Sequence, residues 1–530
     1  MSVETRAGDC LPIKVRNPEG NYIAPGVMGN IVYRRVDGRE LALDAYAQKR
    51  GRNRPAVIVV HGGGWAAGSR IAFVGQFLEM LTRAGYNWFS IDYRLGGIRN
   101  YKDALDDLRA AVEFVRCHAN EFRIDPGRIA LLGEDAGAHL AAMLLAEKPS
   151  VVKSAVLIGG FYDLREIPNL KSQIPDSEFL AEASPIVRGV SGALNLLVVH
   201  GAADNESPIE AARRYCSEAG GNGAQCDFLT VEGGIHRAEN WRPEQWAYKE
   251  RMTKWLGRKL KLSAPDFEPY YGRLRKDSQF VGYEQEDGKI RRLKLDFYRP
   301  PGAGPFPVVI IAHGGGWEAG DKVTYVTPLF EPLAKAGFAW VSIDYSLTPQ
   351  FRHEEQLDDL RRAIDWVRAN AALSDLDPHR IALIGESASG QMVAQIATEK
   401  RKDIAAVVSF YGVYDFVSMV REVAPRSIPA RLFGLGKLDD ETRETLRRYS
   451  PLYNVNAQMP PMLLVCGTKD GLFAQQEAFA LAVGAAGVSY NALALKDAPH
   501  GMENWEGRPE WMEYKTKLVE WLKARLAPRK

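Results

Sequence analysis

The sequence contains the stretch Ile384-Gly-Glu-Ser-Ala-Ser-Gly390, which has the pattern of a tight turn between a strand and a helix. Residues 381–384 form an apolar run that predicts a buried strand, and the apolar positions of 391–397 recur at helical spacing. Small residues stand two positions before and two positions after Ser387. The backbone can therefore bend sharply and hold the serine oxygen at the strand's end, which is the geometry that a serine nucleophile needs.

The chain repeats itself. His61-Gly-Gly-Gly-Trp65 recurs as His313-Gly-Gly-Gly-Trp317, and Ser90-Ile-Asp-Tyr93 recurs as Ser342-Ile-Asp-Tyr345, in both cases 252 residues later. In each copy, β-rich runs alternate with amphipathic segments. This alternation predicts βαβ units and, in each copy, a mostly parallel, doubly wound sheet flanked by helices.

The repeat divides the chain into two domains. A length of 530 residues exceeds what one hydrophobic core usually supports. We expect domains at residues 1–262 and 263–530, joined by a linker within 262–276, where prolines interrupt the periodicity. Each domain should open with a hairpin, for which Asp37-Gly38 and Asp287-Gly288 are the turn signals.

Composition argues against several classes of protein. The net charge of +2 gives no reason to expect a nucleic acid or an anionic membrane as partner, and no apolar run reaches the roughly 18 to 20 residues of a membrane span. The N-terminus lacks the apolar core of a secretory signal, so we expect a cytoplasmic protein unless a signal has been removed. Five cysteines without Cys-x-x-Cys spacing argue against a disulfide scaffold or a structural zinc, although Cys216 and Cys226 could pair in an oxidising compartment.

Each copy resembles an α/β-hydrolase of the carboxylesterase branch, which includes the hormone-sensitive-lipase-like enzymes and bacterial feruloyl or acetyl-xylan esterases. The likeness covers nearly the whole chain. It rests on the two His-Gly-Gly-Gly-Trp motifs, the Gly-x-Ser-x-Gly type turn at Ser387, and the chain order of nucleophile, acid and histidine. The resemblance implies a serine esterase without metal or cofactor that acts on a small-molecule or carbohydrate-linked ester.

In the second copy, Ser387 needs a general base, and histidine is the side chain whose pKa suits that work. Of the four histidines there, His500 follows the last expected strand; the others lie in the glycine motif, a charged segment and a turn (His313, His353 and His379). The resemblance places the acid at Asp470, after the apolar run 462–466. Asp497 and Glu503 are rivals close to His500 in sequence.

A tetrahedral intermediate also needs donors for its negative oxygen. Consecutive glycines let backbone amides converge, and the residue after the nucleophile supplies another amide at a helix N-terminus. We expect Gly315, Gly316 and Ala388 to form this oxyanion hole. Ser389 departs from the glycine usual in the family, so the helix could pack slightly more loosely on the strand.

The first copy has Asp135 where the 252-residue offset places Ser387, although Asp204 and His236 match Asp470 and His500. Three interpretations stay open. Asp135 could accept hydrogen bonds from the old oxyanion amides and pair with His236 in a non-catalytic copy. It could instead attack carbon, as aspartates do in other hydrolases of this fold. The old pocket could also bind an anion or a sugar, with rim candidates Trp65, Arg94, Arg237 and Trp241.

Substrate signals are sparse. The offset grows to 266 at Ser184-Pro185 and Ser450-Pro451, so the second copy has 14 additional residues between 415 and 450. These could cap the site with apolar side chains (Met419, Ile428, Leu432 and Phe433) or only complete the core. Trp317 and Trp505 could stack on an aromatic acid or a sugar. We therefore expect an ester hydrolase for small-acyl, acetyl-sugar or feruloyl-type substrates; a peptidase or amidase using the same residues, or an inactive binding protein, are the alternatives.

Overall fold

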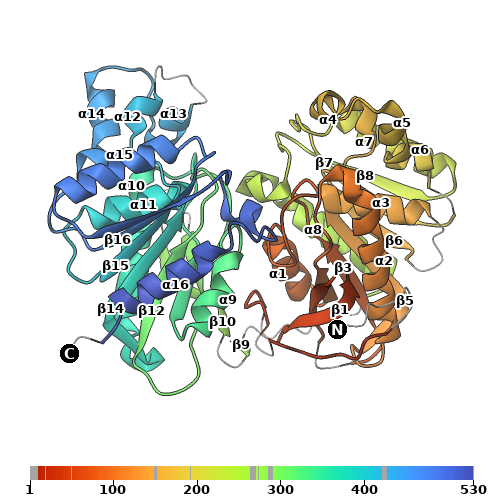
Figure 1. Cartoon of the computed structure of the whole chain (residues 1–530), viewed down its shortest axis with the longest axis horizontal. Helices are drawn as coiled ribbons and strands as arrows, with labels where there is room; N and C mark the ends of the chain where they lie inside the picture. Colours follow the sequence, from red (N-terminus) through yellow and green to blue (C-terminus); the bar gives the residue numbers. More distant parts are fainter. Residues whose placement is uncertain are drawn as a thin grey trace. The chain divides into compact units, whose positions relative to one another are not determined.

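The computed structural model describes residues 10–528 apart from 18–19, 25, 49–50, 148–151, 191, 263–269, 272–273, 285–289 and 421–426. The chain divides into two compact units, residues 1–268 and 269–530 (Figure 1). The expected linker lies largely outside the described residues, and the expected turn at Asp287-Gly288 lies wholly outside them.

In the described part of the first unit, eight strands form one sheet in the order β1-β2-β4-β3-β5-β6-β7-β8. β1 pairs antiparallel with β2 and β2 with β4, whereas all later neighbours are parallel. The strands are β1 (Met28–Val36), β2 (Arg39–Tyr46), β3 (Arg54–Val60), β4 (Asn87–Ile91), β5 (Ile124–Glu134), β6 (Ser154–Ile158), β7 (Asn195–Gly201) and β8 (Gln225–Val231). The helices are α1 (Gly75–Arg83), α2 (Tyr101–Cys117), α3 (Ala136–Ala146), α4 (Pro168–Gln173), α5 (Ser177–Glu182), α6 (Pro185–Arg188), α7 (Ile209–Gly221) and α8 (Ala247–Leu260).

The second unit repeats this strand order and adds β9 at one edge: β9-β10-β11-β13-β12-β14-β15-β16-β17 in the residues described. Its strands are β9 (Tyr270–Tyr271), β10 (Leu274–Glu284), β11 (Ile290–Tyr298), β12 (Phe306–Ala312), β13 (Ala339–Ile343), β14 (Leu376–Glu386), β15 (Ala406–Phe410), β16 (Met462–Gly467) and β17 (Tyr490–Leu495). Its helices are α9 (Thr327–Lys335), α10 (His353–Ala369), α11 (Ala388–Ala397), α12 (Phe416–Met419), α13 (Ile428–Phe433), α14 (Asp440–Arg448), α15 (Phe473–Ala485) and α16 (Glu513–Arg525). The predicted α/β fold class is confirmed for both copies.

Helices cover both faces of the first sheet because its central strands are apolar on both sides. Along β3, Ile58 and Val60 pack in the same core cluster as α2, α3 and α7. The alternate residues Val57 and Val59 pack with α1 and α8 on the other face. Side chains of a strand alternate between faces, so a continuous apolar run is what a doubly wound sheet requires.

The predicted hairpin at the start of the first unit is present. Asp37 and Gly38 join β1 to β2, with φ of +51° and +70°. Two left-handed residues give a type I′ turn, whose twist matches that of the flanking strands.

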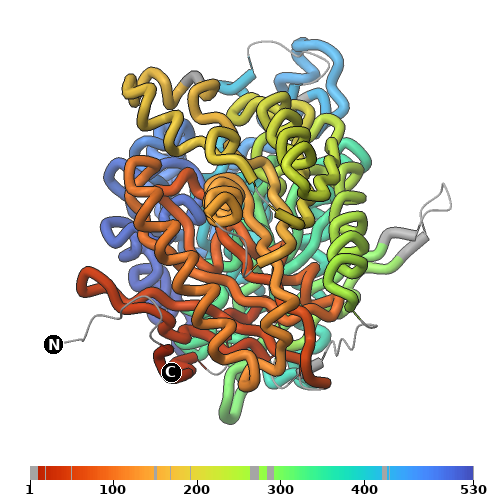
Figure 2. The backbone as a smooth tube through the Cα atoms, turned by 90° about the vertical axis from the view of Figure 1, so that its right-hand side faces the viewer, coloured from red at the N-terminus to blue at the C-terminus, as the bar shows by residue number. Residues whose placement is uncertain are grey.

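Short helices gather at one end of each sheet. In the first unit these are α4, α5 and α6, which lie together in two perpendicular views (Figures 1 and 2). In the second unit α12, α13 and α14 lie together in the same way (Figures 1 and 2). All three of these helices belong to the stretch, between residues 415 and 450, where sequence comparison places the additional residues.

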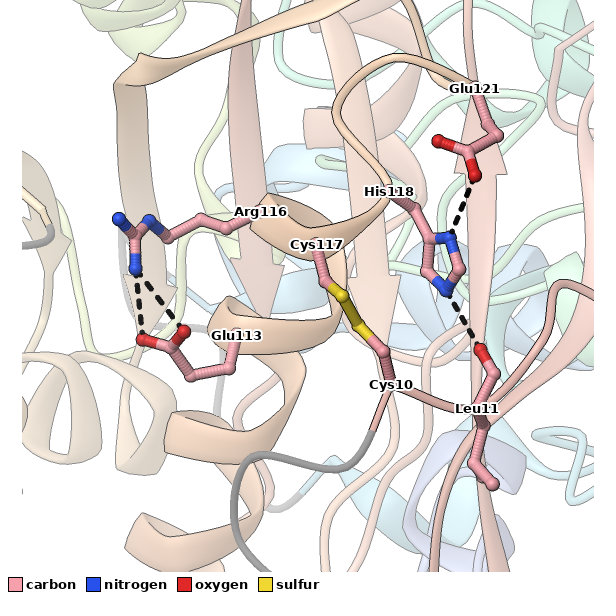
Figure 3. The surroundings of a disulfide bond; sticks show 7 residues. All are labelled: Cys10, Leu11, Glu113, Arg116, Cys117, His118 and Glu121. Carbon is pink, nitrogen blue, oxygen red and sulfur yellow. Dashed lines mark hydrogen bonds and ion pairs between the residues drawn. A yellow bond between two sulfur atoms is a disulfide. The ribbon is translucent and has the colours of Figure 1, made fainter.

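Four of the five cysteines are paired, both pairs in the first unit. Cys216 bonds to Cys226, as their spacing allowed. Cys10 bonds to Cys117 at the end of α2, a pair that was not predicted. His118 Nε2 beside it donates to the Leu11 carbonyl over 2.8 Å (Figure 3). Because disulfides persist mainly in oxidising compartments, this pairing weighs against the expected cytoplasmic location, which stays a prediction. Across the described part of the chain, no helix has both the length and the apolar character to cross a membrane.

Candidate active site

Ser387 stands in the sharp turn between β14 and α11. Its φ and ψ are +55° and −114°, a conformation that non-glycine residues rarely adopt. The turn needs the small residue before it, because a Cβ on Gly385 would lie 2.1 Å from the Ser389 carbonyl oxygen. Asp135 has nearly the same angles, +52° and −119°. The backbone of the turn is thus the same in both units, and the side chain at its tip differs.

The second unit brings three predicted residues together. The Ser387 Oγ lies 3.0 Å from His500 Nε2, and His500 Nδ1 lies 2.7 Å from Asp470 Oδ2. Asp470 follows β16 and is held by the Leu472 amide at its other oxygen, 2.9 Å away. The rival Asp497 is instead exposed and pairs with Lys469. The order hydroxyl, imidazole, carboxylate is the one that general-base activation of a serine requires.

The environment of His500 favours its charged form. Burial acts to lower the pKa of His500, but the hydrogen bond and charge of Asp470, together with the charge of Glu386, raise it above its ordinary value. The imidazole side chain remains 44% exposed, so a substrate can reach its Nε2 edge. Burial also raises the pKa of Glu386, to about 7.

In the first unit, two amides of the glycine loop point toward the side chain at the tip of the turn. Asp135 Oδ2 accepts hydrogen bonds from the Gly63 and Gly64 amides at 2.7 and 2.9 Å. These glycines match Gly315 and Gly316, and the φ angles agree closely: +95° and +58° in the first unit, +93° and +61° in the second. A negatively charged oxygen beside residue 387 would therefore meet the same two donors. Ala388 opens α11, so its amide has no acceptor within the helix.

A tyrosine holds the glycine loop in each unit. The Tyr345 hydroxyl shares its proton between the His313 and Gly314 carbonyls, 3.0 Å from each. Tyr93 does the same for His61 and Gly62 at 2.9 and 3.2 Å. The repeated Ser-Ile-Asp-Tyr motif signalled these residues, although their role was not inferred from the sequence.

In the first unit, the corresponding histidine and aspartate side chains are buried and pair with each other. His236 lies between Asp204, 2.8 Å from its Nδ1, and Asp135, 3.4 Å from its Nε2. Burial acts to lower the pKa of His236, but hydrogen bonds and charge from the two aspartates raise it to about 10. Burial acts to raise the pKa of Asp135, whereas His236 and Arg237 bring it down to about 2. The result is an imidazolium between two carboxylates, with only 3% of the His236 side chain exposed.

The expectation that tryptophans offer stacking surfaces is wrong. Trp317 and Trp505 are 2% and 0% exposed, and Trp65 and Trp241 are 4% and 1% exposed. Trp317 and Trp65 have φ of +62° and +60°, and both belong to the apolar cores. Arg94 and Arg237 are also engaged, with Asp107 and Glu239 respectively.

Ser389 does not loosen the turn. Its hydroxyl accepts from the Glu386 amide at 2.8 Å and donates to the Ala312 carbonyl at 2.7 Å. These bonds join the end of β12 to the end of β14, so the side chain that replaces the family's glycine adds contacts between strands.

The stretch with the additional residues packs partly into the core. Leu432 is fully buried, and Phe433 stacks on Tyr449 with ring centroids 5.1 Å apart. Met419 is instead 44% exposed. Arg431 forms an ion pair with Glu318, directly after the glycine loop. The stretch therefore contacts the segment directly after the glycine loop. Among the residues described, no three His, Cys, Asp or Glu side chains are grouped so that they could hold a metal ion.

The two sheets, the turn at Ser387 and the residues around it define the α/β-hydrolase fold. A family model described as BD-FAE matches residues 43–152 and 295–483, more than half of the chain. The chain belongs to the BD-FAE family.

Curated relatives match part of the chain. A probable carboxylic ester hydrolase, LipM of Mycobacterium tuberculosis, is 30% identical over 202 residues, which is 35% of this chain and 46% of LipM. Esterase LipQ of the same organism is 30% identical over 230 residues, 39% of this chain and 54% of LipQ. The chain thus spans about half the length of these relatives.

Two solved structures of esterases each match about half of the chain. A truncated carbohydrate esterase from gut microbiota is 20% identical, with a TM-score of 0.42, and covers 49% of this chain and 99% of its own. A Pyrobaculum calidifontis esterase is 23% identical, with a TM-score of 0.40, and covers 48% of this chain and 86% of its own.

Proposed function

We propose that this chain hydrolyses carboxylic esters through an acyl-enzyme on Ser387, and that its first unit is a non-catalytic copy. The observation that carries the proposal is the hydrogen-bonded series Ser387, His500 and Asp470, at 3.0 and 2.7 Å, with His500 open to solvent. The names of the curated relatives, a carboxylic ester hydrolase and an esterase, support ester rather than amide substrates.

The reaction has two halves. Ser387 Oγ attacks the ester carbonyl while His500 Nε2 takes the hydroxyl proton, and the carbonyl oxygen, now negative, accepts hydrogen bonds from the amides of Gly315, Gly316 and Ala388. His500 then gives the proton to the leaving alkoxide. A water molecule, deprotonated by His500, attacks the acyl carbonyl. As the acyl–oxygen bond to Ser387 breaks and the acid leaves, His500 returns that proton to Ser387 Oγ. Asp470 accepts from Nδ1 throughout and stabilises the imidazolium.

The first unit has neither free amides for an oxyanion nor an accessible neutral histidine to act as base. Asp135 Oδ2 is held by the two amides that would bind an oxyanion, so a carboxylate there occupies the hole instead of attacking a substrate beside it. The base it would need, His236, is buried and charged near neutral pH because its pKa is about 10. These contacts are the ones that the non-catalytic interpretation requires.

Hydrolysis assays on the wild type and two variants test the proposal. We expect Ser387→Ala to lose at least about 10³-fold in kcat on short-chain aryl, acetyl-sugar or feruloyl esters, and Asp135→Ala to keep wild-type turnover at 25 °C. Matching anilides, assayed in parallel, distinguish an amidase. Activity that survives Ser387→Ala but disappears in Asp135→Ala would make the aspartate copy the enzyme; no activity on any ester would favour a binding protein.

A further inference from the structure

Tyr411 has a backbone conformation that suits glycine. It follows β15 directly, its φ is +35°, and its side chain is fully buried. The matching residue after β6 in the first unit is Gly159, with φ of +52°. The two residues occupy the same place in their sheets, because each amide donates to the next strand: Tyr411 to the Val465 carbonyl of β16, and Gly159 to the Val199 carbonyl of β7. A bulky residue in the left-handed region persists only where its surroundings hold it, and such residues cluster at functional sites.

The Tyr411 side chain contacts three parts of the candidate site. Its ring lies 4.6 Å from the His500 ring, centroid to centroid. Its hydroxyl accepts a hydrogen bond from the Met502 amide at 2.8 Å, two residues after His500. The same hydroxyl acts to lower the pKa of the Glu386 carboxyl, which burial raises. Glu386 in turn accepts from the Gly314 amide of the glycine loop. One side chain thus connects the histidine loop, the turn at Ser387 and the loop of the oxyanion amides.

In the first unit these parts meet without an intervening ring. Glu134, the counterpart of Glu386, accepts directly from the Ala238 amide at 2.6 Å. Ala238 stands two residues after His236, as Met502 does after His500. The histidine there is 3% exposed, against 44% for His500. The tyrosine hydroxyl therefore occupies, in the second unit, a position between two groups that touch in the first.

We propose that Tyr411 is a positioning residue for His500. By separating the Met502 amide from Glu386, it holds the histidine loop outward, so that Nε2 faces the Ser387 hydroxyl at 3.0 Å and stays open to substrate. Its hydroxyl also orients Glu386 toward the glycine loop. This role rests on the proposed function of the second unit and deepens it, because it accounts for the greater exposure of His500 than of His236.

The test removes the hydroxyl alone. Tyr411→Phe should lower kcat and the rate of fluorophosphonate labelling by about 10-fold, the order expected from a small misplacement of a catalytic group, with KM nearly unchanged. The matched control is Tyr414→Phe, a neighbouring buried tyrosine whose hydroxyl pairs with Ser409 at 2.7 Å; its kcat should stay at the wild-type value. Rates are normalised to the sites titrated by the label, so loss of folded protein does not count as loss of rate.

A double variant tests whether Tyr411 acts through Glu386. If it does, Tyr411→Phe combined with Glu386→Gln should cost less than the product of the two single effects. A Tyr411→Phe enzyme with wild-type kcat and labelling rate, or losses that simply multiply in the double variant, would overturn the role. Ser387→Ala is run in parallel to separate the two claims. Turnover that survives Ser387→Ala would contradict the proposed function. Turnover that depends on Ser387 but is unchanged by Tyr411→Phe would contradict only the role of Tyr411.

Discussion

In the proposed reaction His500 must be neutral to take the proton of Ser387, yet its surroundings favour the charged form of the imidazole. Asp470 and Glu386 raise its pKa above 6.5 against the effect of burial. Protonated His500 cannot act as a base, so kcat/KM should rise with pH through this pKa, and the acid limb should have its midpoint above pH 6.5. A profile of kcat/KM from pH 5 to 9 measures it.

Asp470→Asn provides the control for that profile. Removing the negative charge should move the acid limb to lower pH and lower the plateau by about 10³- to 10⁴-fold, because the imidazolium loses its partner and its tautomer is no longer fixed. An acid limb that stays in place when Asp470 is neutralised would mean that another group controls the reaction.

Asp135 is expected to stabilise the first unit rather than to catalyse. It accepts two amide hydrogen bonds and pairs with His236. Asp135→Ala leaves these groups without that acceptor, so we expect the first unit to lose about 3 to 5 kcal/mol of unfolding free energy near neutral pH, while ester hydrolysis by the second unit continues. Thermal unfolding of wild type and variant measures the loss.

The loss should depend on pH in a defined direction. The pKa of Asp135 is lowered to about 2, so its contribution is present above pH 3.8 and fades as pH falls through about 2. The pKa of His236 is raised to about 10, so its contribution is complete below pH 6.5 and fades as pH rises toward 10. The stability difference between wild type and Asp135→Ala should shrink from pH 6 to pH 10. A constant difference would show that the ion pair contributes nothing.

At the scale of elements, the glycine loop depends on the tyrosine that follows β13. The Tyr345 hydroxyl donates to two carbonyls of the loop, and Tyr93 has the same contacts in the first unit. We expect Tyr345→Phe to lower kcat by about 10-fold, less than the loss of a whole oxyanion donor, because the amides remain but are held less firmly.

Tyr93→Phe is the matched control for that experiment. It removes the same hydrogen bonds from the unit that we propose to be non-catalytic, so it should affect thermal stability but leave kcat unchanged. Equal losses of activity in the two variants would contradict a single working site.

At the scale of the whole molecule, both disulfides lie in the first unit, while the second contains only the buried free thiol of Cys466. A bond that closes a loop of about 100 residues stabilises a protein by about 4 to 5 kcal/mol in the chain-entropy account. Dithiothreitol should therefore lower the unfolding temperature of the first unit and leave the second unit's transition and its ester hydrolysis in place. The Cys10→Ala/Cys117→Ala variant should reproduce part of the shift without reductant; hydrolysis that decays together with the first unit would argue that the units are not independent.

The sequence predicts most of the architecture because the repeat has a physical meaning. A constant offset between glycine loops, turns and strands requires two copies of one sheet, and apolar runs such as that of β3 require helices on both faces. The sequence also predicts that Ser387, Asp470 and His500 lie close together. Each follows a strand, and parallel strands end at the same edge of the sheet.

The side-chain surroundings were not predictable in the same way. Trp317 follows a glycine loop and looks like a rim residue, but its left-handed backbone accompanies a buried indole. Tyr411 contacts the His500 ring and the Met502 amide, the latter 91 residues away, and no local pattern signals such contacts. The Cys10–Cys117 pair likewise joins segments 107 residues apart.

The most direct test of the central claim is the site of fluorophosphonate labelling in the intact wild-type chain. The reagent reacts only with an activated serine, so peptide mapping should find one label per chain, on Ser387, and none in Ser387→Ala. A label on any other residue, or a wild-type chain that resists labelling at neutral pH, would contradict the proposal that the second unit is a serine hydrolase.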